Sequence, residues 1–245
     1  DVRYNQKKSF EKISSKSNNY IFKCFNEALK FIKTKKIIGF VNCPISKETL
    51  FKNKHQGITE FLSKKSGMQD NESMLIYSKK LSVSPITTHI PLSKVSKKIN
   101  QYKIVKKVKV INNFYKKFFK KKPNFAILGL NPHNFSPLKN SEEKKIIVKA
   151  IKNLIKSKIK AKGPITPDTS FMIFKKSKFD VIIGMYHDQV LTPFKALFNF
   201  NAINVTLGLP YIRTSPDHGV ATDITGKKSA NPKSLIESIK FFNYI

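Results

Sequence analysis

The sequence predicts an α/β fold built on a largely parallel sheet. Short apolar segments of strand length alternate along the chain with longer segments whose apolar residues recur every three or four positions. Such alternation is typical of βαβ units, in which helices cover the faces of parallel strands. The sequence contains no internal repeat and no low-complexity linker, so we expect ordinary structure to cross any domain boundary.

Four segments have the pattern of helices. Residues 18–34 place Ile21, Phe25 and Ile32 on one side of a helix. Residues 141–160 begin at Ser141, a good N-cap residue, and carry two acids in the first turn, where the helix dipole favours negative charge. The other two helices are expected at residues 94–119, where the pattern allows a break, and at residues 232–245.

Six apolar segments have the length of strands. They are residues 36–44, 73–78, 81–90, 124–130, 179–186 and 201–209. The carboxyl ends of parallel strands meet at one edge of a sheet, and loops there present polar groups from a rigid base. We therefore expect an active site at that edge.

The net charge of +32 at pH 7 would ordinarily point to nucleic acid or an anionic membrane as partner. The kind of cation argues against this reading. All but two of the 47 basic residues are lysine, whereas proteins that read phosphates favour the planar fork of arginine. The run "FYKKFFKKKP" is the best argument for nucleic-acid binding, but the solvated end of an amphipathic helix explains it equally well.

The chain is also expected to be cytoplasmic, without a membrane partner. No apolar run approaches the roughly 18 to 20 residues needed to span a bilayer, and residues 1–10 lack the apolar core of a signal peptide. Cys24 and Cys43 are too few to form a disulfide framework or a metal cluster.

Three of the five histidines follow predicted strands. His89 follows "VSPITT", His133 follows "FAILGLNP" and His187 follows "DVIIGMY". One histidine at a strand end is usually structural, but three with the same placement are a common way to hold a divalent ion and leave positions open for substrate. The spacing alone leaves both readings open, because it does not show that the three loops converge.

Arg213 is the second functional signal. In a chain whose cations are nearly all lysine, an arginine indicates that bidentate hydrogen bonding to a phosphate or carboxylate is needed, with a structural salt bridge as the alternative. Asp217 and His218 follow in a compact polar turn. No G-x-G-x-x-G or Walker sequence is present, so a Rossmann phosphate loop does not hold any cofactor.

Five stretches match the motifs of one enzyme family in order and with similar spacing. They are "TTHIPL", "ILGLNPH", "GPITPDTSF", "DVIIGMYHDQVLTPFK" and "NVTLGLPYIRTSPDHGVATDITGK", and "VNCPISK" and "GITEFL" match two further motifs more loosely. Over nearly its whole length the chain thus resembles the 4-hydroxythreonine-4-phosphate dehydrogenase family, which is related to the isocitrate and isopropylmalate dehydrogenases. The resemblance implies an isocitrate/isopropylmalate dehydrogenase-like fold, with two α/β domains and a cleft between them.

The resemblance also implies how the chain is divided. Residues 1–50 together with residues 217–245 would form the first α/β domain. Residues 51–216 would form the second, with the metal and substrate residues and the dimer interface. The chain begins with Asp1, and the family's N-terminal portion has no counterpart here. We therefore expect an N-terminally truncated chain, either a fragment or a reduced homologue.

Position by position, the resemblance assigns roles to particular residues. The implied metal ligands are His89, His133 and His187. The implied substrate contacts are Thr59, Lys195, Asn204 and Arg213. The predicted catalytic residues are Lys195, Asp168 and Asp188, of which the two acids are polar partners of substrate or ligand. The candidates for cofactor contact are Asp217, His218 and Asp223.

The implied reaction is the oxidative decarboxylation of 4-phosphohydroxy-L-threonine to 3-amino-2-oxopropyl phosphate, a step of pyridoxal 5'-phosphate (vitamin B6) biosynthesis. NAD or NADP would take the hydride, and one divalent ion per site (Zn, Mg or Co) would acidify the alcohol and stabilise the enolate left by decarboxylation. Family enzymes build the site between two subunits, so a homodimer with a shared active site is expected.

The sequence departs from the family at one substrate-binding motif. The family's Gly-His-Thr-Glu appears as Gly57-Ile58-Thr59-Glu60, so isoleucine replaces a histidine expected at the substrate. His55 lies three residues earlier and is an alternative donor. This departure leaves two other readings open: the same chemistry on a different phosphorylated four-carbon hydroxy acid, or a catalytically inactive homologue.

Overall fold

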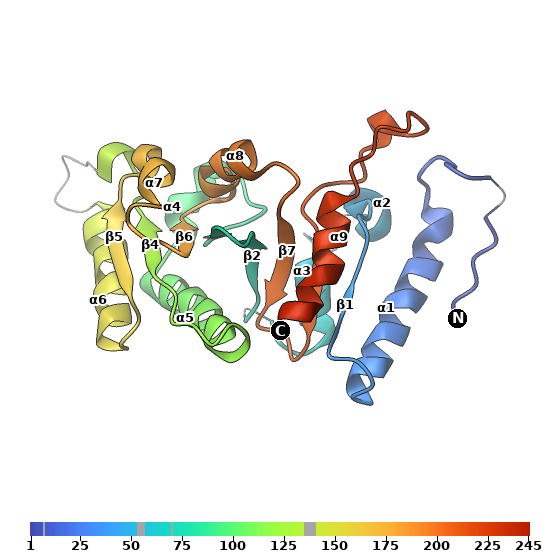
Figure 1. Cartoon of the computed structure of the whole chain (residues 1–245), viewed down its shortest axis with the longest axis horizontal. Helices are drawn as coiled ribbons and strands as arrows, with labels where there is room; N and C mark the ends of the chain where they lie inside the picture. Colours follow the sequence, from blue (N-terminus) through green and yellow to red (C-terminus); the bar gives the residue numbers. More distant parts are fainter. Residues whose placement is uncertain (7, 53–56, 70, 135–140) are drawn as a thin grey trace.

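The described residues contain eight strands in one sheet, with helices packed against it (Figure 1). The structure is a computed structural model that describes residues 1–6, 8–52, 57–69, 71–134 and 141–245. In spatial order the strands are β1 (Gly39–Val41), β8 (Ile212–Pro216), β7 (Ile203–Leu207), β2 (Ser73–Tyr77), β3 (Ser82–Pro85), β6 (Val181–Gly184), β4 (Phe125–Leu128) and β5 (Ala161–Ile165). The predicted α/β class is confirmed.

The sheet is parallel in its outer parts and antiparallel in its middle. β1 pairs in parallel with β8, and β3, β6, β4 and β5 form a parallel group. The pairs β2–β3, β2–β7 and β7–β8 are antiparallel. Residues 78–81 connect β2 to β3, and residues 208–211 connect β7 to β8. Connections of four residues are too short to cross over to a parallel strand, so each joins an antiparallel pair. The prediction of a largely parallel sheet is therefore wrong for the middle strands.

The turn between β7 and β8 requires glycine at its first position. Gly208 has a φ of +84°, in the left-handed region that other residues rarely adopt. A Cβ there would also lie 2.0 Å from the backbone oxygen of Asn71. Glycine is therefore favoured at this position, where the chain turns back from β7 to β8.

The alignment of β7 with β8 places polar side chains in rows across one face of the sheet. Arg213 lies opposite Thr206, and Thr206 lies opposite Met74 of β2. Asn204 and Ser215 form the next row. Because side chains alternate along a strand, all of these residues point to the same face.

Nine α-helices surround the sheet. They are α1 (Asn18–Lys33), α2 (Lys47–Phe51), α3 (Ile58–Lys65), α4 (Val95–Lys98), α5 (Gln101–Phe118), α6 (Val148–Lys156), α7 (Pro167–Ile173), α8 (His187–Phe198) and α9 (Lys233–Lys240), all within the described ranges. The four predicted helical segments are confirmed, and the break in the second lies between α4 and α5. Before α6, Ser141 accepts the backbone N–H of Lys144, as an N-cap residue does.

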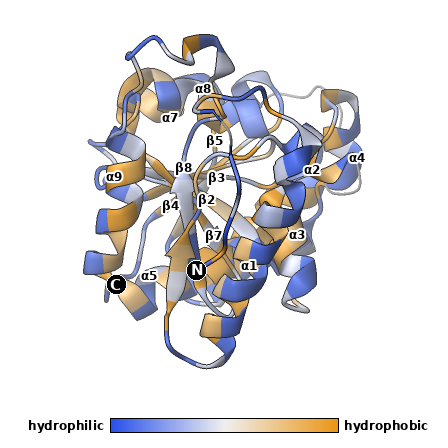
Figure 2. Ribbon diagram, turned by 90° about the vertical axis from the view of Figure 1, so that its right-hand side faces the viewer, coloured by the Kyte–Doolittle hydropathy of each residue, from blue (hydrophilic) through white to orange (hydrophobic). Residues whose placement is uncertain are grey.

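Apolar residues on the two faces of the sheet form separate clusters. Along β6, Val181 and Ile183 pack on the side of α5 and α6, whereas Ile182 packs on the side of α8. A third cluster joins α1, α2 and α3. Figure 2 shows both apolar and polar patches on helices such as α1 and α9, as expected for helices that cover a sheet on one side only.

The predicted division into two domains stays a prediction. The proposed boundaries separate β1 from β8, and these two strands are neighbours in the single sheet. Within the part of the chain that the structure describes, no helix combines the length and the apolar character needed to cross a bilayer.

The close approach of β1 and β8 gives a test of the fold. Gly39→Ala would place a Cβ 2.1 Å from the backbone oxygen of Ile212, which forces the two strands apart. We expect the free energy of unfolding to fall by about 1 to 3 kcal/mol, as in overpacked cores. Urea denaturation measures the change. Gly219→Ala is the control, because a Cβ there meets nothing within 4 Å. Equal losses in both variants would contradict the predicted contact.

Candidate functional site

The three predicted metal ligands follow three neighbouring strands that run in the same direction, β3, β6 and β4. His89 follows β3, and His187 begins α8 just after β6. His133 lies in the short helical turn η3 (Pro132–Asn134) after β4. All three therefore lie toward one edge of the sheet, as the sequence predicted.

A cavity of about 220 Å³ gathers most of the predicted site residues. Its floor is the face of the sheet that carries Asn204, Arg213 and Ser215, and α8 forms one wall. The predicted residues that line it are Thr59, His89, His187, Lys195, Asn204, Arg213, Asp217 and His218. Those that do not line it are His133, Asp168, Asp188 and Asp223.

His89 and His187 lie next to each other in this cavity, with ring centroids 5.9 Å apart. Nδ1 of His89 is 3.8 Å from Oε1 of Glu60, and Nδ1 of His187 is 2.6 Å from Oδ1 of Asp188. Each ring thus turns Nδ1 toward a carboxylate, which leaves Nε2 for another partner. The sequence did not single out Glu60, whose role becomes visible only through this contact.

His133 stands apart from that pair. Its side chain is 76% exposed, and its Nδ1 is 3.8 Å from Oδ2 of Asp168. Among the described residues no three histidine, cysteine or acidic side chains are grouped so as to hold a metal ion. One chain therefore brings together two of the three predicted ligands.

Arg213 is a buried cation without a carboxylate partner. It is 3% exposed, its Nε donates to Oδ1 of Asn42 at 2.6 Å, and its Nη1 donates to Oγ1 of Thr206 at 3.2 Å. Burial lowers the pKa of Arg213 to about 10, so the side chain keeps its charge at neutral pH. Within the described ranges no acidic side chain lies within ion-pair distance of it, so the predicted alternative of a structural salt bridge finds no partner there.

Lys195 and Asp217 form a second charged group on the cavity wall. Nζ of Lys195 donates to the backbone oxygen of Asp217 at 2.8 Å and lies 3.6 Å from its carboxylate Oδ2. Burial raises the pKa of Asp217 above its usual range, although the charge of Lys195 opposes that rise. His218 also lines the cavity, whereas Asp223 is exposed in the turn η5 (Thr222–Ile224).

Three buried oxygens in the cavity lack a hydrogen-bond partner among the described residues. They are Oε2 of Glu60, Oδ1 of Asn204 and Oδ2 of Asp217. Buried polar atoms are nearly always paired, so unpaired acceptors that face one cavity indicate a ligand that brings donors or positive charge. These acceptors suit a substrate that brings hydroxyl or amino donors, whereas a metal ion would need a ligand beyond this group of described residues.

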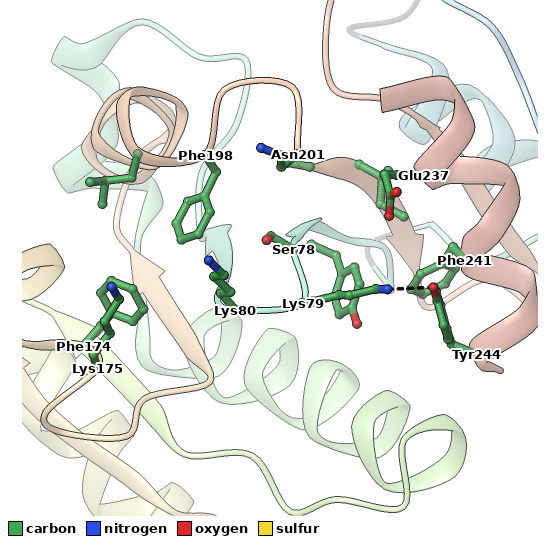
Figure 3. A pocket seen from close by; sticks show the side chains of 14 residues that line it. Ser78, Lys79, Lys80, Phe174, Lys175, Phe198, Asn201, Glu237, Phe241 and Tyr244 are labelled. Carbon is green, nitrogen blue, oxygen red and sulfur yellow. Dashed lines mark hydrogen bonds between the residues drawn. The ribbon is translucent and has the colours of Figure 1, made fainter. Parts of the chain in front are cut away.

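A second, larger cavity lies at the other end of β3 and is shown in Figure 3. Its volume is about 440 Å³, and lysines and aromatic rings line it. Lys79 donates to the hydroxyl of Tyr244 across this cavity (Figure 3). None of the predicted site residues lines it, so the histidine-lined cavity is the candidate active site.

Comparison with known proteins identifies the family of the chain. The sequence profile of the family described as "Pyridoxal phosphate biosynthetic protein PdxA" matches residues 1–242. The chain belongs to the PdxA family. The 4-hydroxythreonine-4-phosphate dehydrogenase of Sulfurihydrogenibium sp. is 44% identical over 217 residues, which cover 87% of this chain and 66% of that relative. The resemblance seen in the sequence is confirmed.

Other members and solved structures show the same relationship. The D-threonate 4-phosphate dehydrogenase of Pectobacterium atrosepticum is 31% identical over 93% of this chain and 71% of its own length. The crystal structure of 4-hydroxythreonine-4-phosphate dehydrogenase from Klebsiella pneumoniae has a TM-score of 0.79 and 32% identity, covering 94% of this chain and 71% of that one. Isocitrate dehydrogenase from Methylococcus capsulatus shares the fold alone, at a TM-score of 0.54 and 10% identity. The chain thus spans about two thirds of the length of its PdxA relatives.

The isoleucine that departs from the family motif is part of the core. Ile58 is 5% exposed and packs with Phe25, Phe51 and Phe61, yet it also lines the cavity. The cavity wall is therefore apolar where the PdxA motif has histidine. His55, the alternative donor, lies outside the described residues.

Two polar side chains that the sequence analysis missed hold the turns bearing the histidines. Glu143 accepts the backbone N–H groups of Leu130 and Asn131, just before His133. Gln189 accepts the N–H of Met185 and donates to the oxygen of Gly129, which ties the turn after β6 to the end of β4. Gln189 lies within the matched stretch "DVIIGMYHDQVLTPFK" and Glu143 in the first turn of a predicted helix, but their roles become visible only through these contacts.

Glu143 makes a testable contribution to stability. Burial raises its pKa, but the hydrogen bonds from Asn131 and Leu130 outweigh this effect and hold the pKa below its usual range. The stabilisation is therefore present above the ordinary carboxyl pKa and is lost as the pH falls through the lowered value. Glu143→Gln should lower the free energy of unfolding at pH 7 by about 1 to 2 kcal/mol. Urea denaturation from pH 7 to pH 3 should show this difference shrinking, and a constant difference would contradict the assignment.

Proposed function

We propose that the chain carries out NAD-dependent, metal-assisted oxidative decarboxylation of 4-phosphohydroxy-L-threonine in pyridoxal phosphate biosynthesis. The observation that carries this proposal is the buried Arg213, which forms no ion pair with the described residues and lies in the cavity that also holds His89, His187 and Lys195. A buried guanidinium without a directly paired acid favours binding of an anion, and the substrate brings two anionic groups, a phosphate and a carboxylate.

Four residues of the cavity bind the substrate in this proposal. Arg213 and Lys195 hold the phosphate and the carboxylate between them. Oδ1 of Asn204, which lacks a partner among the described residues, accepts a hydrogen bond from the substrate. The hydroxyl of Thr59 lies 3.3 Å from the hydroxyl of Thr206, which accepts a hydrogen bond from Arg213. Thr59 therefore extends the row of polar groups that Thr206 and Arg213 form on the cavity floor.

His89 and His187 are proposed to hold the divalent ion, whether Zn, Mg or Co, through their Nε2 atoms. Neutral imidazoles leave the ion its full charge, with which it would lower the pKa of the substrate hydroxyl and stabilise the enolate left after loss of carbon dioxide. Asp188 and Asp168 act through the histidine rings that they face rather than on the substrate. Lys195 supplies positive charge beside the reacting carbons.

A nicotinamide cofactor, NAD or NADP, is proposed to accept the hydride from the carbon that bears the 3-hydroxyl. Asp217 and His218 are the cofactor candidates that line the cavity, and Asp223 lies six residues beyond Asp217 in the exposed turn η5. Because Asp217 contacts Lys195, a proposed substrate residue, we propose that Asp217 lies where the cofactor and the substrate meet.

A homodimer is proposed to complete the metal site. The exposure of His133 and its absence from the cavity support a role for this histidine in the site of a second copy. The protein is further proposed to be cytoplasmic and to bind neither nucleic acid nor membrane. For nucleic acid this rests on the predominance of lysine among its cations.

A second candidate reaction keeps the chemistry but uses D-threonate 4-phosphate, which lacks the amino group. It is supported by the relative named D-threonate 4-phosphate dehydrogenase, which is 31% identical to this chain, and by Ile58, which changes the cavity wall where the family motif has histidine. The third reading is a catalytically inactive homologue that keeps the binding site.

The reaction is tested by measuring NADH production with a divalent ion and each phosphorylated substrate. We expect turnover of 4-phosphohydroxy-L-threonine, and Arg213→Lys should lower kcat/KM about 10- to 100-fold through loss of a charge-assisted hydrogen bond. Arg3→Lys changes the other arginine, which is exposed, and should have no effect. Turnover of D-threonate 4-phosphate alone would favour the second candidate. Binding of Co²⁺ without turnover of either substrate would favour the inactive homologue.

The shared site is tested by mixing two variants. His133→Ala and His187→Ala should each bind little Co²⁺ alone, because each lacks one ligand in every site. Mixed and allowed to exchange subunits, they should regain about a quarter of the wild-type binding, since half of the dimers are hybrids with one intact site. No recovery in hybrids whose formation is verified by native mass spectrometry would rule out a shared site.

A further inference from the structure

Of the three carboxylates that face the Nδ1 atoms of the candidate metal ligands, Glu60 is the most enclosed. It lies in the first turn of α3, and its side chain is 25% exposed. The carboxylates that face the other two histidines, Asp168 and Asp188, are 58% and 78% exposed. Glu60 is therefore the carboxylate whose position the fold itself determines.

The backbone of Gly57 brings this carboxylate and the histidine ring together. A Cβ at Gly57 would lie 2.7 Å from Oε2 of Glu60 and 3.7 Å from Nδ1 of His89. The missing side chain leaves room for the carboxylate, whereas the ring of His89 would only be in van der Waals contact with such a Cβ. Gly57 has an extended backbone, so space rather than backbone conformation explains glycine here.

All three candidate ligands present the same ring atom to an acid. The contact is between Nδ1 and a carboxylate oxygen in His89, His133 and His187 alike. A neutral imidazole whose Nδ1 carries the proton has its lone pair on Nε2, the form that binds a metal through Nε2. Free imidazole side chains favour the tautomer with the proton on Nε2. A carboxylate at Nδ1 therefore shifts the tautomer equilibrium toward the form with the proton on Nδ1.

We propose that Glu60 is the positioning residue of His89. Its Oε1, which lies 3.8 Å from Nδ1 in the structure, would close to hydrogen-bond distance and accept the Nδ1–H of the ring, which fixes the tautomer and directs Nε2 into the cavity. The metal-binding consequence rests on the proposed function, whereas the tautomer does not depend on it.

The tautomer is measured by ¹⁵N NMR of the imidazole nitrogens in the metal-free protein. We expect His89 to carry its proton on Nδ1 in the wild type and in Glu60→Gln, whose amide oxygen still accepts. In Glu60→Leu the proton should move to Nε2. Glu48→Leu, which changes an exposed acid in the first turn of the neighbouring helix α2, is the control and should leave His89 unchanged.

The second measurement is the affinity for Co²⁺. Glu60→Leu should weaken binding about 10- to 100-fold, the usual effect of removing the partner of a ligating histidine. Glu60→Gln should recover most of this affinity. Gly57→Ala should weaken binding as well, because its Cβ displaces the carboxylate while Glu60 stays in the chain. If Glu60→Leu fails to fold, Gly57→Ala provides the same comparison.

The outcomes separate the two claims. An unchanged tautomer of His89 in folded Glu60→Leu, or in Gly57→Ala if the former does not fold, overturns the positioning role. A wild type that binds no Co²⁺ overturns the proposed metal mechanism, and the tautomer comparison still decides the role of Glu60.

Discussion

The candidate site depends on a guanidinium ion that is buried without a carboxylate. Removing a charge from water costs several kcal/mol, and the neutral oxygens of Asn42 and Thr206 offset only part of that cost. A buried acid would neutralise Arg213 but would also fill its binding capacity. The structure instead leaves the guanidinium without a directly paired acid among the described residues, at the floor of a cavity, and three strands must stay in register to hold it there.

Two parts of the fold contribute different chemistry to the same cavity. The antiparallel strands β2, β7 and β8 form a polar floor, on which hydroxyl, amide and guanidinium groups lie in rows. The parallel strands β3 and β6 deliver imidazoles from their carboxyl ends. The antiparallel pair of β2 and β3 joins the polar floor to the parallel strands that carry the histidines. Its short connection reverses the chain, so the two groups of strands lie side by side in one sheet.

The sequence predicted six of the eight strands in the described part of the chain and missed β5 and β8. Segments such as residues 124–130 and 179–186 are mostly apolar because both faces of those strands are covered. β8 escaped notice because Arg213 and Ser215 face the cavity and break the apolar pattern. Pro193 and the polar first turn hid α8 in the same way. Arg213 and the histidines could be singled out by residue type, whereas the importance of Glu60 and Asn42 lies only in their contacts.

The glycine turn between β7 and β8 has a consequence for how the site tolerates change. A slip of one residue in that pairing would exchange the two faces of β8, and Arg213 would then point into the apolar cluster instead of the cavity. The guanidinium would then be buried among apolar side chains, at a cost of several kcal/mol. Gly208 therefore serves both the packing of the strands and the anion-binding floor, because the pairing that keeps Arg213 in the cavity also keeps Ile212 in the core.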